Sequence, residues 1–489
     1  MTVTTALDRG TAVSVSCAGC GAAAPAGVPF PAQCPATVEA DDVDHVMIRR
    51  LDLGRVRLVA SDDPNPFVRY RQLFRAWRVA TAAGWSDERY VGVVRRLDDA
   101  IAAVDGHGFR VTPFGRAGTL SDELGFTRDG GAWVKDETGG VAGSHKARHL
   151  MGILLELLVA ETLDPGLATR PLAIASCGNA ALAAAVVARA AARRLDVFVP
   201  PDAQPAIVDR LRQLGARVEP VARTAGERGD PTVRRMRAVV AAGAIPFTCQ
   251  GPENGLAIEG AQTLGYEMAE ALGSAGTTLD RLVVQVGGGA LASACAQGLA
   301  EARALGVIEA LPRLDTVQTA GAWPLRRAHE RIAADLRDRG LDPAGPLNAD
   351  LSAVREVLDR AARHRSAYMW PWETEPASIA HGILDDETYD WLAVARAMLA
   401  TGGRPIVVDE AELRETNELA LRATGIQADA TGTAGLAGLR QLRRLDDAAP
   451  GERVAVLLTG IRRAPPAESP PAESPPAEQP TPTASATPT

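Results

Sequence analysis

Short apolar runs alternate with helix-forming stretches through most of the chain. Residues 180–194 are rich in alanine, and residues 206–214 are amphipathic and end at Gly215, a predicted helix C-cap. Strands that alternate with helices indicate parallel sheets in an α/β protein. Runs of four or five mainly apolar residues, typical of buried strands, stand at 172–175, 196–199, 282–286, 405–408 and 454–458.

The two ends of the chain depart from this pattern. Residues 464–489 include three Pro-Pro-Ala-Glu repeats and end in Thr, Pro, Ser and Ala, a composition that predicts a disordered tail. Residues 1–64 form an N-terminal extension with the spacing Cys17-x2-Cys20 and a further Cys34. A zinc ribbon needs a second pair, and the spacing of His45, which could complete a site, follows no known pattern. We expect a degenerate ribbon that no longer holds metal.

Composition narrows the classes of function. The chain is 46% hydrophobic and 23% charged, as in globular proteins that dissolve in water. A net charge of −8 argues against a nucleic-acid partner. The sequence has neither a membrane-spanning apolar run nor a start that resembles a signal peptide. We therefore expect a cytoplasmic protein without a membrane partner, and six cysteines do not suggest a disulfide scaffold.

Lys146 follows a Gly-Ser turn and precedes an apolar helical stretch. A positive charge is disfavoured at a helix N-terminus, and such a lysine suits Schiff-base chemistry. On this motif alone, an ordinary solvated lysine is the stronger interpretation.

Three loops offer further chemistry at the ends of predicted strands. Residues 176–180 could bind a carboxylate through backbone N–H groups, or form an ordinary turn capped by Asn179. Residues 287–291 contain three glycines that could wrap a phosphate, and they match neither the dinucleotide fingerprint nor the Walker loop. The hydroxyl of Thr459 could bond a ring nitrogen or merely cap its strand.

In this order, a lysine, an anion loop, a phosphate loop and a terminal hydroxyl resemble the fold-type II pyridoxal-phosphate enzymes, the tryptophan synthase β superfamily. The resemblance covers about 65–463, which it identifies as the catalytic region. It implies two three-layer α/β domains with pyridoxal 5′-phosphate in the cleft between them, and a smaller mobile subdomain at about 171–270. The motifs at 259–263 and 378–382 resemble threonine synthases and serine/threonine dehydratases, whereas His145 before the lysine resembles tryptophan synthase β.

The resemblance also implies a role for each group. Lys146 would form the Schiff base and move the substrate α-proton, Asn179 would bond the phenolic oxygen, and Thr459 would bond the pyridine nitrogen. Cys177 could act as an acid or base opposite the lysine, although a small residue that simply fits is the stronger interpretation. The phosphate would be held by Gly287, Gly288, Gly289, Ala290 and Leu291. The substrate carboxylate would be held by Ser176, Cys177, Gly178, Asn179 and Ala180.

A neutral hydroxyl at the ring nitrogen favours β-elimination and β-replacement, by the same resemblance. We therefore expect α,β-elimination on a small hydroxy-amino acid such as serine or threonine, the reaction of a dehydratase or ammonia-lyase. A threonine synthase-like or other β-replacement enzyme is the alternative, and a cofactor-binding protein without catalysis is a third. We expect a homodimer, because dimers are usual in the family.

Overall fold

The computed structural model describes residues 11–25, 27–38, 40–59, 61–224, 229–348 and 351–463. The tail expected at 464–489 lies outside the described residues. Within the described part of the chain, no helix is both long and apolar enough to cross a membrane.

A six-stranded sheet forms the larger half of the molecule, with the strand order β11-β10-β9-β12-β4-β3. Its strands are parallel except for the short edge strand β3, which pairs antiparallel with β4. The strands span Phe114–Arg116 (β3), Gly131–Asp136 (β4), Arg281–Gln285 (β9), Arg313–Thr319 (β10), Pro405–Val408 (β11) and Arg453–Leu458 (β12).

A second, four-stranded parallel sheet has the order β7-β6-β5-β8. Its strands span Leu172–Ala175 (β5), Leu195–Val199 (β6), Arg217–Pro220 (β7) and Ile245–Pro246 (β8). All four lie within the expected smaller subdomain at about 171–270, whose mobility stays a prediction.

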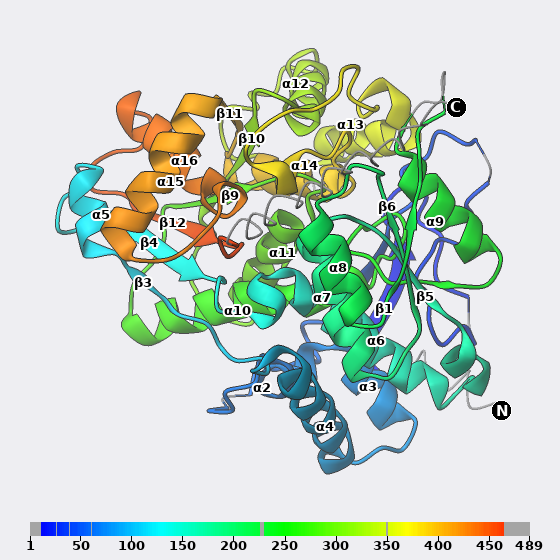
Figure 1. The fold of residues 1–489 in the computed structure, drawn as a ribbon. Helices are drawn as coiled ribbons and strands as arrows, with labels where there is room; N and C mark the ends of the chain where they lie inside the picture. The colour runs from blue at the N-terminus through cyan, green and yellow to red at the C-terminus, as the bar shows by residue number, and fades with distance from the viewer. Residues whose placement is uncertain are drawn as a thin grey trace, which may run out of the picture.

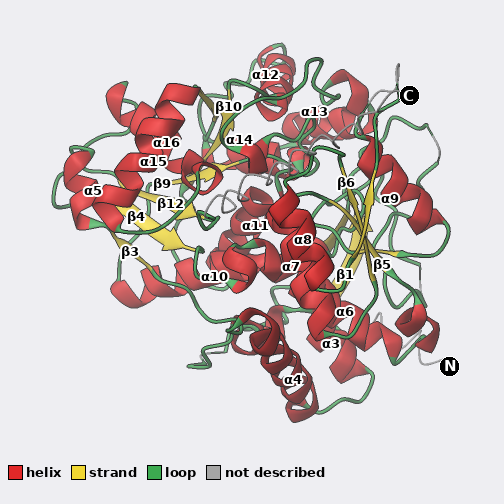
Figure 2. Ribbon diagram, in the orientation of Figure 1, coloured by secondary structure: helices red, strands yellow, loops and turns green. Residues whose placement is uncertain are grey.

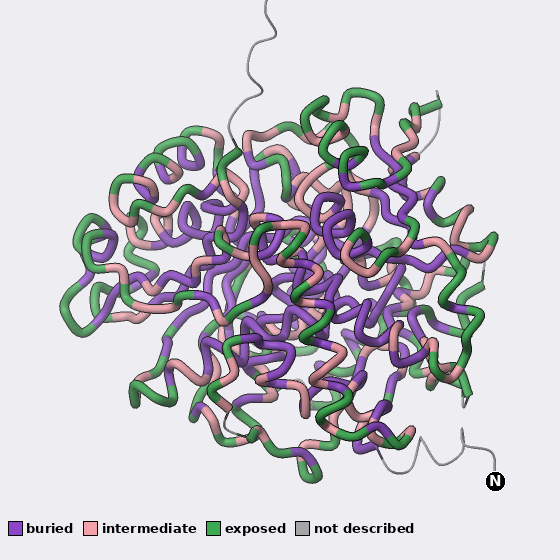
Figure 3. Tube along the Cα trace, turned by 60° about the horizontal axis from the view of Figure 1, so that its bottom comes forward, coloured by how far each residue is buried: buried purple, intermediate pink, exposed green. Residues whose placement is uncertain are grey.

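Four helices lie between the two sheets (Figures 1 and 2). These helices are α6 (Lys146–Glu161), α7 (Asn179–Ala190), α10 (Ala257–Ala275) and α11 (Ala290–Ala304), and most of their residues are buried. Figure 3 shows that buried residues gather at the centre of the molecule. Helices α6 and α10 touch through Gly152 and Gly260, since a Cβ on Gly152 would lie 2.7 Å from the Gly260 Cα. The two sheets are thus joined by one shared helical layer.

The outer faces of both sheets are also covered, which gives the expected three-layer α/β architecture. Helices α15 (Glu410–Thr424) and α16 (Ala430–Arg444) cover the large sheet, and α9 (Pro231–Ala241) covers the small one (Figure 1). The remaining helices are α2 (Pro66–Arg69), α3 (Arg75–Ala82), α4 (Asp87–Asp105), α5 (Gly118–Glu123), α8 (Pro205–Gln213), α12 (Pro324–Arg337), α13 (Ser352–Arg363) and α14 (Trp391–Thr401).

The N-terminal extension contains the antiparallel strands β1 (Val13–Cys17) and β2 (Met47–Leu51). Their pairing sets Cys17 opposite Met47, two residues beyond His45. The donor atoms of Cys17, Cys20, Cys34 and His45 consequently lie within 4.8 Å of one another. Strand pairing thus brings a fourth candidate ligand from a distant part of the sequence, and the expectation of a ribbon that no longer holds metal stays a prediction.

A buried network of charges connects β4, α6 and α10. The Arg148 Nε lies 2.9 Å from a Glu137 carboxylate oxygen, and Glu267 accepts hydrogen bonds from both Arg148 and Lys135. None of the four side chains is more than 3% exposed. Burial would raise the pKa of Glu267, but Arg148 and Lys135 lower it below its usual value. The network fixes the first turn of α6, where Lys146 stands.

Replacing Glu267 with glutamine should destabilise the protein by about 3–5 kcal/mol, because it leaves buried Lys135 without a counter-charge and Arg148 with Glu137 alone. The lowered pKa of Glu267 means that its contribution is present above about pH 4.3, the unfolded value, and is lost as the pH falls through the lower folded value. Urea unfolding measures both effects. The matched control is Glu330→Gln, which breaks an exposed pair with Arg326 and should cost below about 1 kcal/mol. Equal costs for the two variants would contradict the prediction.

Candidate active site

Lys146 is the first residue of α6 and follows a loop that is bound to the end of β12. Ser144 forms an isolated antiparallel bridge with Gly460, and the Ile461 N–H donates to the Gly143 carbonyl at 2.9 Å. Gly460 directly follows Thr459. The structure therefore brings together the lysine and the hydroxyl that the sequence places at opposite ends of the catalytic region.

The scarcity of lysine singles out Lys146 more strongly than its motif does. Only two of the 52 Lys and Arg residues are lysines. Lys135 is fully buried and paired with Glu267, whereas Lys146 is half-buried and has no ion pair among the described residues. Lys146 is thus the one lysine amine open to reaction with a carbonyl, a signal that counting lysines in the sequence would have supplied.

Thr459 is buried at the end of β12, and its hydroxyl accepts a hydrogen bond from Gln285 Nε2 at 2.7 Å. An amide N–H can only donate, so the Thr459 proton is free for another acceptor. This arrangement suits a ring nitrogen that carries no proton. Gln285 is the one polar residue in the otherwise apolar run 282–286. Its buried side chain makes this hydrogen bond to Thr459.

Asn179 is the first residue of α7, which packs on the small sheet, and its side chain lies beside the residues that follow β12. Its Oδ1 accepts a hydrogen bond from Arg463 at 2.9 Å. A Cβ on Gly460 would lie 3.1 Å from Asn179 Nδ2, so a larger residue at position 460 would crowd this contact. Asn179 and Thr459, predicted from separate motifs, therefore lie at one junction between the two sheets.

The glycine loop connects β9 to α11 at this junction. Gly289 has φ +93°, a conformation that favours glycine, and the Gly288 carbonyl accepts from the Asp390 N–H at 2.9 Å. A Cβ on Gly287 would collide with a carboxylate oxygen of Asp385. The Gly288 N–H also bonds this carboxylate and thereby lowers its pKa. One N–H of the loop thus bonds a carboxyl group, and Ala290 and Leu291 begin α11 behind the loop. That the loop binds a phosphate stays a prediction.

Acidic residues that the sequence prediction missed surround the lysine. Burial raises the pKa of Asp385 and of Asp386 to about 6, and that of Asp390 to about 7. The charge of Lys146 lowers the pKa of both Asp385 and Asp390, so these two acids interact electrostatically with its amine. The run Asp385-Asp386-Glu387, directly after the 378–382 motif, is the sequence signal that could have revealed them.

The predicted carboxylate loop, residues 176–180, joins β5 to α7. Ser176 Oγ accepts the Gly178 N–H at 3.4 Å, and Gly178 and Ala180 are half-buried beside it. Solvent reaches Cys177, yet desolvation and the nearby Asp230 raise the pKa of its thiol. The thiol therefore stays protonated near neutral pH and is a poor candidate for a base.

Buried polar atoms beside Lys146 test whether a cofactor fits. Ser144 Oγ and both ring nitrogens of His145 have no hydrogen-bond partner among the described residues. Burial and the charge of Lys146 hold the pKa of His145 well below its usual value, so its ring is neutral. An amine, an anion loop, a free hydroxyl proton and unpaired polar atoms together fit pyridoxal 5′-phosphate, provided that Asp385 is protonated or withdraws when the phosphate binds.

Comparison with known proteins agrees with this fit. A family model described as "Pyridoxal-phosphate dependent enzyme" matches residues 107–460, well over half of the chain. The threonine synthase of Methanocaldococcus jannaschii is 24% identical over 207 residues, which are 42% of this chain and 42% of that protein. The threonine synthase of Methanosarcina acetivorans is 23% identical over 354 residues, 71% of this chain and 74% of that protein. The chain thus spans less than half the length of the first relative.

Solved structures share the fold. Threonine deaminase isoform 2 from Solanum lycopersicum superposes with a TM-score of 0.53 at 14% sequence identity, and the match covers 78% of this chain and 86% of that one. The architecture of two α/β halves around a shared helical layer is therefore found in a solved enzyme structure as well.

Lys146→Ala should abolish the covalent attachment of pyridoxal 5′-phosphate, because Lys135 is buried in its ion pair. Wild-type protein should be yellow, and borohydride reduction should add the cofactor mass to the peptide that contains Lys146. The variant should show neither signal. Cofactor mass on Lys135, or a colourless wild-type protein after incubation with the cofactor, would contradict the assignment.

Asp385→Asn should bind pyridoxal 5′-phosphate about tenfold more tightly than wild type at pH 8, because it removes a negative charge from the phosphate loop. The pKa of Asp385 is about 6, so its carboxylate is charged above that pH and neutral below it. The difference in Kd should therefore shrink as the pH falls towards 5. Fluorescence titration of both proteins measures it, with Asp386→Asn as a neighbouring control of smaller effect. A Kd ratio that does not change with pH would refute this account.

Proposed function

Because the chain belongs to the fold-type II pyridoxal-phosphate dependent enzymes, we propose that it catalyses α,β-elimination on a small hydroxy-amino acid such as serine or threonine. The products are a 2-oxo acid and ammonia. When bound, the cofactor supplies an electron sink for the negative charge that develops at the substrate α-carbon. The protein supplies the proton transfers, the orientation and the electrostatic environment.

We propose that Lys146 is the residue to which the cofactor is attached, and that its amine is the base that takes the α-proton of the substrate. The charges of its half-buried amine and of Asp385 and Asp390 interact. Once the substrate amine has displaced the lysine amine from the cofactor, that amine is free to take the α-proton.

The loop 176–180 is proposed to bind the substrate carboxylate at the N-terminus of α7, where backbone N–H groups and the helix dipole favour an anion. Asn179 lies between this loop and the end of β12 through its contact with Arg463. We therefore propose that it bonds the phenolic oxygen of the cofactor. Cys177 is assigned to the wall of this site rather than to proton transfer.

The hydrogen bond from Gln285 to Thr459 is the observation that carries the choice of reaction. It leaves the Thr459 proton to be donated, so the group that meets Thr459 must accept. A ring nitrogen that accepts a hydrogen bond is uncharged, and an uncharged ring is a weaker electron sink than a protonated one. Such a site favours loss of a β-substituent over transamination.

The acids around the site favour a substrate without a phosphate group. Asp230 and Asp385 both raise the pKa of Cys177, so their negative charge extends over the substrate loop. Like charges brought together in an interface cost several kcal/mol. A hydroxyl or amine on the substrate β-carbon is compatible with this field, whereas a phosphate ester is not.

A threonine synthase-like or other β-replacement reaction is the second candidate, supported by the names of the curated relatives. The acids count against a phosphorylated substrate, which places this candidate behind elimination. A cofactor-binding protein without catalysis is a third, and the free amine of Lys146 counts against it. The homodimer and the cytoplasmic location expected from the sequence stay predictions.

A panel of four substrates separates these functions: serine, threonine, 2,3-diaminopropionate and O-phosphohomoserine. We expect 2-oxo acid from serine or threonine, with kcat/KM more than about tenfold above that for any reaction of phosphohomoserine, a difference of about 1.4 kcal/mol. A coupled dehydrogenase assay measures the oxo acid, and phosphate release measures the alternative. Lys146→Ala is the inactive control.

Threonine and phosphate from phosphohomoserine would establish the synthase-like function instead. No turnover of any substrate by protein that carries the cofactor on Lys146 would favour the binding protein.

A further inference from the structure

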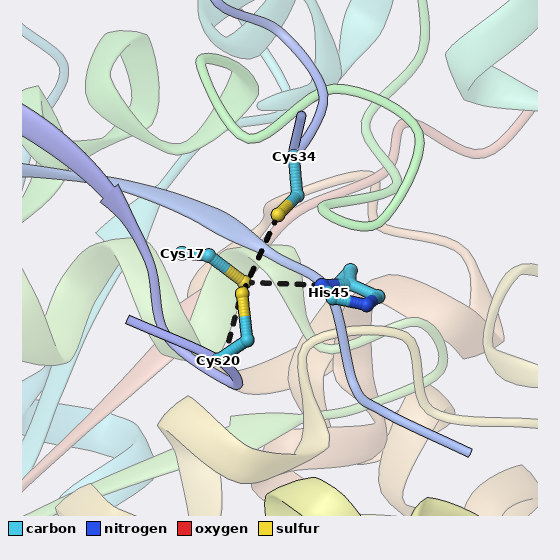
Figure 4. Close-up of side chains that lie close together, drawn as sticks. All are labelled: Cys17, Cys20, Cys34 and His45. Carbon is cyan, nitrogen blue, oxygen red and sulfur yellow. Dashed lines mark hydrogen bonds between the residues drawn. The ribbon is translucent and has the colours of Figure 1, made fainter. Parts of the chain in front are cut away.

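Four side chains of metal-binding types gather in the N-terminal extension (Figure 4). Cys17 ends β1, Cys20 stands in the turn that follows, Cys34 comes from the next loop, and His45 precedes β2. The Cys20 and Cys34 sulfurs are 3.6 Å apart, and the Cys17 sulfur is 3.4 Å from His45 Nδ1. Their donor atoms all lie within 4.8 Å of one another.

The separations of 3.6 and 3.4 Å match two edges of a tetrahedron around one ion. With Zn–S bonds of about 2.3 Å and Zn–N bonds of about 2.0 Å, ideal geometry puts sulfurs about 3.7 Å apart and sulfur about 3.5 Å from nitrogen. A disulfide would need about 2.05 Å between the sulfurs, so Cys20 and Cys34 are not joined. Three thiols and an imidazole that face one centre are the donor set of a metal site.

Neighbouring groups hold the ligands in a metal-binding orientation. His45 Nε2 lies 2.9 Å from an Asp41 carboxylate oxygen, to which it donates, and this leaves Nδ1 to face the sulfurs. Carboxylates commonly fix metal-ligating histidines in this way. The Cys20 N–H points to the Cys17 sulfur at 3.5 Å, and the Ala36 N–H points to the Cys34 sulfur at 3.4 Å. Both are contacts that strengthen when the acceptor is a thiolate.

We propose that Cys17, Cys20, Cys34 and His45 bind one Zn²⁺ in a closed structural site. Three thiolates and one imidazole favour zinc over hard cations such as Mg²⁺ or Ca²⁺. Four protein ligands leave no open position for water or substrate, which is the mark of a structural rather than a catalytic ion. The inference rests on the N-terminal extension alone and does not depend on the reaction proposed above.

The proposed zinc site is tied to the acidic segment beside the glycine loop. Asp44, next to the ligand His45, donates its N–H to the Ala362 carbonyl at 2.7 Å and accepts from Arg365 at 3.1 Å. Arg365 also pairs with Glu387 at 3.1 Å, within the run that contains Asp385. Zinc therefore anchors a chain of contacts that ends at the phosphate loop.

Metal analysis of the full-length protein tests the site. Wild-type protein expressed with zinc should contain about one Zn²⁺ per chain after dialysis, and Cys20→Ser and His45→Ala should each lose it. The matched control, Cys295→Ala, changes a buried cysteine in α11 and should keep the ion. Co²⁺ in place of Zn²⁺ should give thiolate charge-transfer absorbance in the wild type and in the control only. Zinc below about 0.1 per chain in the wild type, or zinc retained by both ligand variants, would overturn the proposal.

Alkylation of the cysteines in the wild-type protein tests the zinc site without the variants, and it therefore still decides the question if the variants fail to fold. Cys17, Cys20 and Cys34 should resist a thiol reagent until a chelator is added, as read by mass spectrometry of their peptides. Exposed Cys177 should react in both conditions and serves as the internal control. Chelation should also speed hydrogen exchange in residues 385–390. Equal alkylation with and without chelator would refute the zinc site, and unchanged exchange would refute the link to the phosphate loop.

Discussion

The position of Lys146 depends on a buried set of charges rather than on the loop that precedes it. Arg148, one turn into α6, pairs with Glu137 from the end of β4 and with Glu267 from α10, and Lys135 shares the second carboxylate. Buried charges are costly unless each is paired, so the three elements can pack in only one register. That register sets where the helix begins, and with it the place of the amine.

Five of the twelve strands among the described residues (β5, β6, β9, β11 and β12) could be predicted from the sequence because their residues are mainly apolar. The site motifs could be predicted because they stand at the ends of such strands. The strands β4 and β10 escaped prediction, since Lys135, Asp315 and Gln318 are polar and yet buried. Their burial depends on partners from distant elements, such as Arg281 for Asp315. The placement of His45 beside Cys17 was missed for the same reason, because it is a product of strand pairing, which spacing along one segment does not encode. The acidic run 385–387 was visible in the sequence, but its position beside the glycine loop depends on tertiary contact.

Two electrostatic tendencies meet at the junction of the sheets. The glycine loop and the start of α7 favour anions, while Asp230, Asp385 and Asp386 oppose them. An anion is therefore favoured where it meets the backbone N–H groups of the glycine loop or of the start of α7. It is repelled where it lies beside the three carboxylates. Specificity of this kind comes from repulsion as much as from attraction.

Strand β12 lies in the middle of the large sheet, between β9 and β4, although it is the last strand of the described chain. It carries Thr459, and its end binds the loop before Lys146 and the side chain of Asn179. During synthesis, the lysine and both anion loops are made long before the strand that joins them. Pairing across such a long sequence separation is intrinsically slow. Because Thr459 and the contact to Asn179 come only with β12 and the residues after it, the site is complete only when this strand has paired between β9 and β4.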